Sequence, residues 1–411
     1  MKRVMMIAAI VSCMSMQVFS QDSPVQVSVF RNDLSLTTMP KLVDGKVLVQ
    51  DFKDGFYRFY TFDIQSGTPA EVRSHSKYLY PVAFSGTYVA WIECQVKITY
   101  GPPSPGSTAI ADTSVQYHVK AMNVADRTEH TLSTDTLFKE YIAAHGDKVV
   151  WTDYRHMSPG DTTVEIYMYD FSRMEESRVT EVQGYKAWPH IYNNRIVWQD
   201  YRHAGTTNNA DIFLRDLDSG VETGICTEGS YQSQPHIFED KVVWQDYRNA
   251  STEENNADIF FKDLGTNEIK EVCTVSGYQG TPKVYGNYIV WQDYRNAQQD
   301  SSNADIYMYD LSGNTEYHVT KQSGYQGEPV LWESNIVWQD YSDMFLYKGV
   351  IDAVSSISGG SRLLPLPSAI SEKPECFYDL SGRRIPRKSI HNRIILKRNP
   401  TGSIERFGDI R

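Results

Sequence analysis

The sequence has little cysteine, little basic charge and, beyond its first residues, no long apolar segment. Five cysteines occur among 411 residues, and their spacing matches no zinc or thiol redox motif. After the amino-terminal segment, no stretch approaches the ~20 apolar residues that a membrane-spanning helix requires. Acidic residues outnumber basic ones, 51 against 40, and the formal net charge of −11 argues against a nucleic-acid partner.

The known sequence signatures of catalysis are also missing. The chain shows no Ser–His–Asp order, no nucleophile-elbow sequence and no phosphate-binding loop. We therefore assign no catalytic residue, no metal ligand and no resident cofactor from motifs alone. No segment has a sustained helical period, which favours an all-β chain.

The dominant feature is a repeat centred on tryptophan. Five copies, including RIVWQDYRH and YIVWQDYRN, are spaced 47, 46, 47 and 47 residues apart at Trp151, Trp198, Trp244, Trp291 and Trp338. A period in this range is typical of solenoids, propellers and arrays. Each unit carries four short apolar runs with period-two alternation, bounded by Gly, Asn, Asp, Ser and Pro. We name them strands A to D, and four-stranded units of this length predict a β-propeller.

Two degenerate copies precede the five clear ones, with Val49 and Trp91 in the tryptophan position. Seven A strands are expected to begin near Pro40, Pro81, Ile142, Pro189, Pro235, Pro282 and Pro329. The seventh unit lacks strand D, whereas an orphan strand, residues 25–31, lies upstream of the first unit. We expect this strand to complete the last blade and remove its open edge. The sequence thus predicts an all-β, seven-bladed propeller over residues 21–352.

The end of strand B and the Asp-Ile-Tyr of ADIYMYDL resemble the repeats of TolB-type propellers. The resemblance covers roughly 80% of the chain, although TolB propellers have six blades. It implies the fold and little about the activity, because propellers support binding, scaffolding and several unrelated chemistries.

Residues 1–20 have the features of a secretory signal peptide, with Lys2 and Arg3, an apolar stretch and the small residue Ser20. The alternative is a lipoprotein-type cleavage before Cys13. Both interpretations predict export, with no transmembrane segment in the mature chain.

Residues 353–375 form a linker rich in Ser, Gly and Pro. Residues 376–411 resemble the C-terminal sorting domain of the type IX secretion system, through the matching positions Tyr378, Asp379, Leu380, Gly382, Arg383, Arg384, Ile394, Ile395 and Leu396. The resemblance implies a small β-sandwich-like module, contact with the type IX machinery, and a location outside the cell or on the outer-membrane surface of a Gram-negative bacterium. The alternative is a basic β-module that packs on the propeller.

The A strands of a propeller line its central channel. His190 and His236 follow Pro in the A strands of adjacent blades, and Lys283 and Lys41 hold the same place in two others. Such side chains bind an anionic ligand or a metal. Oligogalacturonate lyases use a similar propeller with a channel metal held by His. Here only two His recur and no third ligand is identifiable, so we assign no metal site.

Seven acidic residues recur two positions after the tryptophan position: Asp51, Glu93, Asp153, Asp200, Asp246, Asp293 and Asp340. They form either a ring that binds cations such as Ca²⁺ or local locks made with the Arg two residues later. We favour the locks, and assign structural roles to Trp198, Asp200, Arg202, Trp244, Asp246, Arg248, Trp291, Asp293 and Arg295. Tyr231, Tyr278 and Tyr325, at the D–A loops, are either sugar-stacking platforms or inter-blade packing.

The B–C and D–A loops share one face and are the longest, with Gln95 to Thr113 the longest of all. Loops on rigid scaffolds carry recognition. We therefore expect a secreted or surface-attached binding or scaffold module for an extracellular protein or carbohydrate. The alternative is an extracellular propeller enzyme, a polysaccharide lyase or hydrolase, with its site in the channel. Cys226 and Cys273 lie in neighbouring D strands, too far apart for a disulfide.

Overall fold

The structure, a computed structural model, describes residues 23–36, 38–75, 79–100, 111–205, 209–250, 256–297 and 303–352, together with four short strands near the carboxyl terminus. The chain divides into two compact units, Met1–Val354 and Ser355–Arg411. The expected signal peptide and linker lie outside the described residues. Within the described ranges, no helix is long and apolar enough to cross a membrane.

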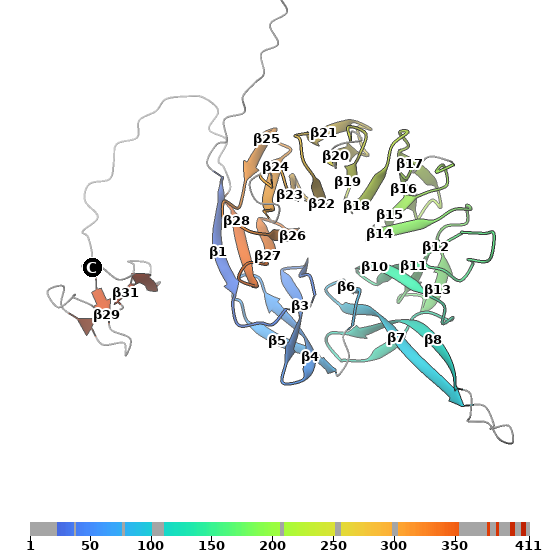
Figure 1. Ribbon diagram of the computed structural model, residues 1–411, viewed down its shortest axis with the longest axis horizontal. Helices are drawn as coiled ribbons and strands as arrows, with labels where there is room; N and C mark the ends of the chain where they lie inside the picture. The colour runs from blue at the N-terminus through green and yellow to red at the C-terminus, as the bar shows by residue number, and fades with distance from the viewer. Residues whose placement is uncertain are drawn as a thin grey trace, which may run out of the picture. The chain divides into compact units, whose positions relative to one another are not determined.

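The first unit is a ring of seven four-stranded antiparallel sheets, as the repeat predicted (Figure 1). Blade 1 contains β2 (Lys41–Val43), β3 (Lys46–Lys53), β4 (Phe56–Asp63) and β5 (Pro69–His75). Blade 2 contains β6 (Val82–Phe84), β7 (Tyr88–Tyr100), β8 (Ala111–Asn123) and β9 (Glu129–Thr131). Blade 3 contains β10 (Lys139–His145), β11 (Lys148–Asp153), β12 (Glu165–Asp170) and β13 (Glu175–Arg178).

The remaining blades follow the same order of strands A to D. Blade 4 contains β14 (Lys186–Tyr192), β15 (Arg195–Asp200), β16 (Asp211–Asp216) and β17 (Glu222–Cys226). Blade 5 contains β18 (Gln232–Phe238), β19 (Lys241–Asp246), β20 (Asp258–Asp263) and β21 (Ile269–Cys273). Blade 6 contains β22 (Gln279–Tyr285), β23 (Tyr288–Asp293), β24 (Asp305–Asp310) and β25 (Thr315–His318). Blade 7 contains β26 (Gln326–Trp332), β27 (Asn335–Asp340), β28 (Phe345–Ile351) and β1 (Val25–Arg31).

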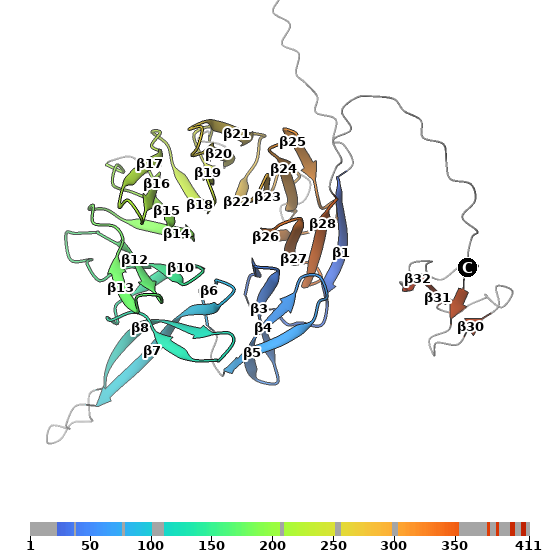
Figure 2. The ribbon, with the colours of Figure 1, turned by 180° about the vertical axis from the view of Figure 1, so that it is seen from behind.

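The ring closes through the amino-terminal strand, which confirms the expected role of residues 25–31. Strand β1 pairs antiparallel with β28, from Val25 opposite Ile351 to Arg31 opposite Leu346 (Figure 2). The chain then crosses to blade 1, where the Ser35 N–H donates to Asp51 at 2.6 Å. One segment therefore ties the last blade to the first.

Strand B is buried on both faces because each blade is covered by its two neighbours. Trp198, Trp244 and Trp291 are 0% exposed. Trp244 packs in one cluster with Val197 of the preceding blade and Val242 of its own strand. A tryptophan at this position fills the space between blades, and this explains why it recurs at a fixed period.

The A strands of blades 3 to 7 begin three residues earlier than the sequence predicted. Each contains a bulge, and the residue just before the proline position has positive φ: Tyr141, Trp188, Gln234, Thr281 and Glu328, with φ between 44° and 54°. Proline has no N–H to donate and is tolerated at the first residue of a strand, so the sequence predicted that each A strand starts at its proline. The bulge lets the strand continue past a residue that cannot donate.

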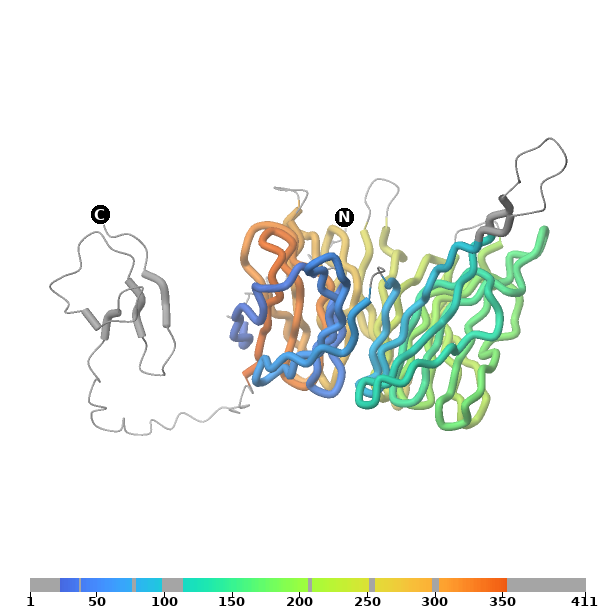
Figure 3. Tube along the Cα trace, turned by 90° about the horizontal axis from the view of Figure 1, so that it is seen from below, coloured from blue at the N-terminus to red at the C-terminus, as the bar shows by residue number. Residues whose placement is uncertain are grey.

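The prediction of a long loop from Gln95 to Thr113 is wrong. Most of it is a strand pair, because β7 continues to Tyr100 and β8 starts at Ala111, with Val96 opposite Val115 (Figure 3). Alternating β-branched residues favour this pairing, and only residues 101–110 lie outside the described part. The central parts of the other long B–C loops also lie outside it.

Cys226 and Cys273 are buried free thiols, as their D-strand positions predicted. Burial raises the pKa of Cys226 to about 11. The Sγ atoms accept hydrogen bonds from Arg248 at 3.2 Å and Arg295 at 3.1 Å. These cysteines therefore belong to the packing between blades.

The second unit contains a four-stranded antiparallel sheet in the order β30-β29-β31-β32. Its strands are β29 (Cys376–Tyr378), β30 (Arg384–Ile385), β31 (Ile395–Arg398) and β32 (Ile404–Phe407). The other residues of this unit lie outside the described part. Its sorting role and its sandwich-like form stay predictions.

Candidate functional site

The central channel contains a cavity of about 410 Å³. It is lined by the A strands, in which buried and partly exposed residues alternate, as in β14. Because side chains two apart point to the same side of a strand, each blade places three residues into the channel. These residues form three rings along its axis.

The mouth ring lies nearest the D–A loops, where the A strands begin. Its members are Met39, Tyr80, Tyr141, Trp188, Gln234, Thr281 and Glu328. Trp188 is 39% exposed and Tyr80 is 53% exposed. The rings of Tyr141 and Trp188 lie 4.2 Å apart between centroids. Seven equivalent positions thus hold seven side chains of mixed chemistry, including two large aromatic surfaces in contact with solvent.

The middle ring contains the channel residues that the sequence predicted. Its members are Lys41, Val82, Ala143, His190, His236, Lys283 and Val330. The structure brings His190, His236 and Lys283 together on three consecutive blades, and the two imidazole centroids are 3.8 Å apart. The four polar members lie on blades 1, 4, 5 and 6, whereas blades 2, 3 and 7 contribute apolar side chains.

The third ring is aromatic and lies nearest the A–B turns. Its members are Val43, Phe84, His145, Tyr192, Phe238, Tyr285 and Trp332. Centroid distances of 4.6, 4.7 and 4.1 Å join His145, Tyr192, Phe238 and Tyr285 in sequence. Gly45 permits the approach of Trp332, since a Cβ there would lie 3.2 Å from the indole ring. This ring lies at the end of the channel opposite the mouth.

The two channel histidines have a defined tautomer. The Ile237 N–H donates to His190 Nδ1 at 3.3 Å, and the Val284 N–H donates to His236 Nδ1 at 3.4 Å. Burial, with Lys283 and Lys41 nearby, holds the pKa of both imidazoles well below the ordinary value. A neutral imidazole whose Nδ1 accepts a hydrogen bond carries its proton on Nε2. Each Nε2–H is therefore a donor, and it offers no lone pair to a metal.

Burial and Glu328 affect the pKa of both channel lysines. Burial lowers the pKa of Lys283 to about 8, although Glu328 acts in the opposite direction. Burial also lowers the pKa of Lys41, again opposed by Glu328. Lys41, Lys283 and Glu328 therefore form one electrostatic group across the middle and mouth rings.

Tyr231, Tyr278 and Tyr325 lie elsewhere, in a belt of tyrosines outside the channel lining. The belt runs through Tyr154, Tyr185, Tyr201, Tyr231, Tyr247, Tyr278, Tyr294, Tyr325 and Tyr341, with contacting rings 4.7–6.1 Å apart. The hydroxyls bond within it, as when Tyr201 donates to Tyr231 at 3.1 Å. This geometry favours the inter-blade packing alternative.

The recurring aspartates are held by local hydrogen bonds. Asp246 Oδ2 accepts from Trp244 Nε1 at 2.9 Å and from the Arg248 guanidinium at 2.7 Å, while Oδ1 accepts from the Arg248 backbone N–H at 2.9 Å. The guanidinium also lies 4.2 Å from the centroid of Phe260. Asp200 and Asp293 have equivalent bonds. These contacts are those expected of a local lock.

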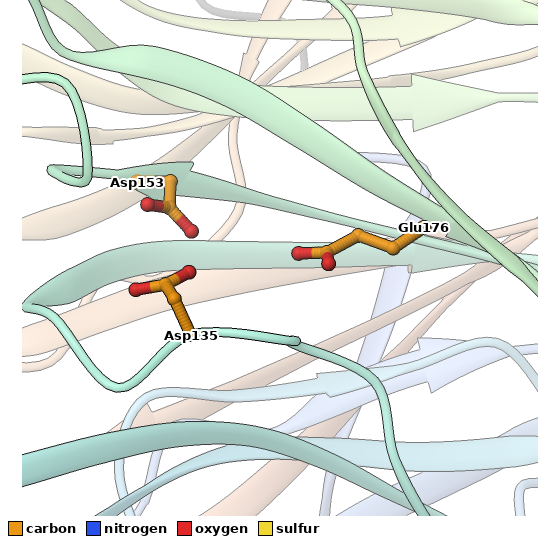
Figure 4. A group of neighbouring side chains, drawn as sticks. All are labelled: Asp135, Asp153 and Glu176. Atoms are coloured by element: carbon orange, nitrogen blue, oxygen red, sulfur yellow. The ribbon is translucent and has the colours of Figure 1, made fainter.

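One group of three carboxylates has the spacing of a metal site. Oxygens of Asp135, Asp153 and Glu176 lie within 4.8 Å of one another (Figure 4). However, Lys139 Nζ lies 2.9 Å from Asp135, and Arg155 Nη2 lies 2.8 Å from both aspartates. Arg155 also bonds Glu176. Two cations already occupy this space, so we assign the group as an ion-pair network.

The polar members of the middle ring were predicted from the sequence, whereas the mouth ring was not. The mouth residues differ from blade to blade, so no repeat marks them. The available signal was their position directly before the proline of the A strand, or before Ile142 in blade 3.

No protein-family model and no curated protein matches this chain. Solved structures do match its fold. An oligogalacturonate lyase from Vibrio parahaemolyticus matches with a TM-score of 0.57 and 11% identity, over 82% of this chain and 97% of that one. The tricorn protease matches with a TM-score of 0.53 and 11% identity, over 80% of this chain and 34% of that one.

A TolB structure from Agrobacterium tumefaciens is also similar, with a TM-score of 0.43 and 14% identity, over 66% of this chain and 90% of that one. The chain spans about a third of the length of the tricorn protease. At these identities the likeness concerns the fold alone. The comparisons therefore show that the chain is similar in fold to β-propellers of several different activities.

Proposed function

We propose that this chain is an exported binding propeller that holds a glycan at the mouth of its central channel. The observation that carries the proposal is the mouth ring. In the B strands and the tyrosine belt the same residues recur from blade to blade, as expected of a scaffold. At the mouth, equivalent positions hold unlike residues, which is the pattern of a site selected for one ligand.

The chemistry of this ring suits a sugar. Aromatic rings present flat apolar faces at little cost in side-chain entropy, and Trp188 and Tyr80 are both more than a third exposed. Gln234, Thr281 and Glu328 provide hydrogen-bonding groups on blades 5, 6 and 7. Gln234, Thr281 and Glu328 also have positive φ, a backbone conformation that a β-branched residue such as Thr281 rarely adopts and that is found most often at functional sites.

Replacing Trp188 by Ala should remove glycan binding and leave the fold intact. The indole is the exposed partner in the tilted contact with Tyr141, so its loss removes an exposed aromatic surface and little core packing. Loss of such a stacking surface is expected to weaken binding at least about tenfold. A glycan array followed by calorimetry on the wild type and Trp188→Ala measures the effect.

The matched control is Phe56→Ala, which removes an aromatic ring of 47% exposure outside the channel lining. It should bind the array hits as the wild type does. Equal loss in both variants, or unchanged binding by a folded Trp188→Ala, would exclude the mouth as the glycan site.

Export is the second part of the proposal, and it is supported by the resemblance of residues 376–411 to type IX sorting domains. A chain truncated after residue 352 should fold and stay in the periplasm, because the propeller is a separate compact unit. Cell fractionation with circular dichroism of the purified protein measures both. Undiminished surface or medium levels of the truncated chain would contradict the sorting role.

A lyase or hydrolase working in the channel is the second candidate. It is favoured by Lys283, since an amine whose pKa lies at about 8 can act as a general base near neutral pH. Incubation of each array hit with the protein, followed by mass spectrometry of the products, separates the two functions. Cleavage that disappears in Lys283→Met would establish the enzyme.

A further inference from the structure

We propose that the middle ring is an anion-binding site, in which Lys41, Lys283, His190 and His236 hold an oxyanion of the ligand below the mouth. The inference rests on the proposed function for the identity of the carrier, because it makes that glycan an acidic one. The shared chemistry is a carboxylate or sulfate group in contact with N–H donors.

The first support is that the polar groups facing this level of the channel are donors. Lys41 and Lys283 supply ammonium groups, and within the described residues neither makes a hydrogen bond or ion pair with another side chain. Both line the cavity and are partly buried there. Two cations held in a channel without a bonded counter-ion favour an incoming anion.

The histidines give independent support through their tautomer. Both Nδ1 atoms accept backbone N–H groups from the next A strand. The imidazoles therefore offer Nε2–H to the channel while neutral. Such a pair suits an oxyanion and is unsuited to a metal, which requires a lone pair on Nε2.

The donors and the aliphatic side chains of the middle ring lie on different blades, and this determines the orientation of a bound ligand. The donors occupy blades 4, 5, 6 and 1, with Val330 of blade 7 between the last two, whereas blades 2 and 3 contribute Val82 and Ala143. An acidic sugar can place its charged group on the donors and an apolar ring face against the two aliphatic side chains. Among the described residues, Glu328 in the mouth ring of blade 7 is the carboxylate that acts on both lysines.

The probes for a test are glucuronate, glucose 6-sulfate and glucose, with binding measured by calorimetry at pH 6.5. Either charged sugar should bind at least about tenfold more tightly than glucose, the ratio expected of one charge-assisted contact. Glucuronate alone would identify a carboxylate, and the sulfate ester alone would identify a sulfate. Equal binding of all three sugars, or no binding of any of them and of free sulfate, would overturn the inference.

Two variants should change the affinity for the charged probe in opposite directions. Lys283→Met should weaken binding of the charged probe about tenfold or more, and Glu328→Gln should strengthen it by about threefold. The control, Lys53→Met, removes the same charge from an exposed site and should change nothing. Unchanged affinity in a folded Lys283→Met, or weaker binding in Glu328→Gln, would contradict the site.

The pH profile of the wild type gives a measurement that needs no variant. Lys283 binds the anion as an ammonium, so affinity should fall as pH rises through about 8. Lys41, His190, His236 and Glu328 face the same space, and the neutral histidines do not change charge in that range. A flat profile from pH 6.5 to 9.5 would count against the role of Lys283.

Two outcomes distinguish the anion site from the mouth site. Glycan binding that depends on Trp188 but does not distinguish acidic from neutral sugars would leave the mouth site standing and exclude the anion site. Binding of free sulfate that depends on Lys283, with no glycan bound, would do the reverse.

Discussion

Deletion of residues 23–33 is expected to unfold the propeller or to drive it into oligomers. The deletion removes β1, so β28 is left as an open edge and the last blade loses its fourth strand. It also uncovers the cluster in which Val25 packs with Trp338 and Ile351. Unpaired edges of this kind associate with other chains. Thermal melts and light scattering measure both outcomes.

Single substitutions along β1 test the role of this strand in ring closure without shortening the chain. Val25 is 8% exposed and Val27 is 40% exposed. Val25→Asp places a charge in the core and should cost ~3 kcal/mol. Val27→Asp should change stability by less than about 0.5 kcal/mol. Equal effects of the two variants, or a deleted chain that melts as a monomer at the wild-type temperature, would show that β1 is not required for closure.

Asp246→Ala is expected to destabilise the protein by about 3 kcal/mol, because it leaves the Arg248 charge and the Trp244 N–H without their buried acceptor. The melting temperature should fall by roughly 5 °C or more. Asp246→Asn is the matched variant. Its amide oxygen can still accept one of these bonds, so its loss should be smaller.

The competing prediction is a ring of cation sites at these aspartates. Melts of the wild type, Asp246→Ala and Asp246→Asn with calcium and with chelator distinguish the two. The structural role predicts that the variants differ from the wild type by the same amount in both conditions. A wild-type melting temperature raised strongly by calcium, with Asp246→Ala unresponsive, would establish a cation-binding ring.

The sequence predicted the blade count, the closing strand and the channel side chains because each depends on a repeated pattern. The tryptophan period counts blades, and the absent strand D of the last unit pairs with the extra strand at residues 25–31. His190 was predicted to face the channel because it lies in an A strand, and the A strands of a propeller line the channel.

Other features depended on single residues that no period marks. The bulge before each proline results from one residue with positive φ, and propensity alone does not place Trp188 or Glu328 there. The tautomer of His190 depends on a backbone N–H of the next blade, 47 positions away. The sequence predicted a loop in place of the β7–β8 pair because the Gly- and Pro-rich tip outweighed the alternation on both sides.

The closing strand also bears on the order of events during folding. Gln26 and Asp352 bond to each other across 326 positions of the chain. A growing chain therefore cannot complete its ring until the last blade has been synthesised. Contacts this distant in sequence form slowly, because the chain loses the entropy of the closed loop before the new contacts stabilise it. The incomplete ring is thus the longest-lived intermediate expected of this chain, and it is the form that a chaperone would encounter.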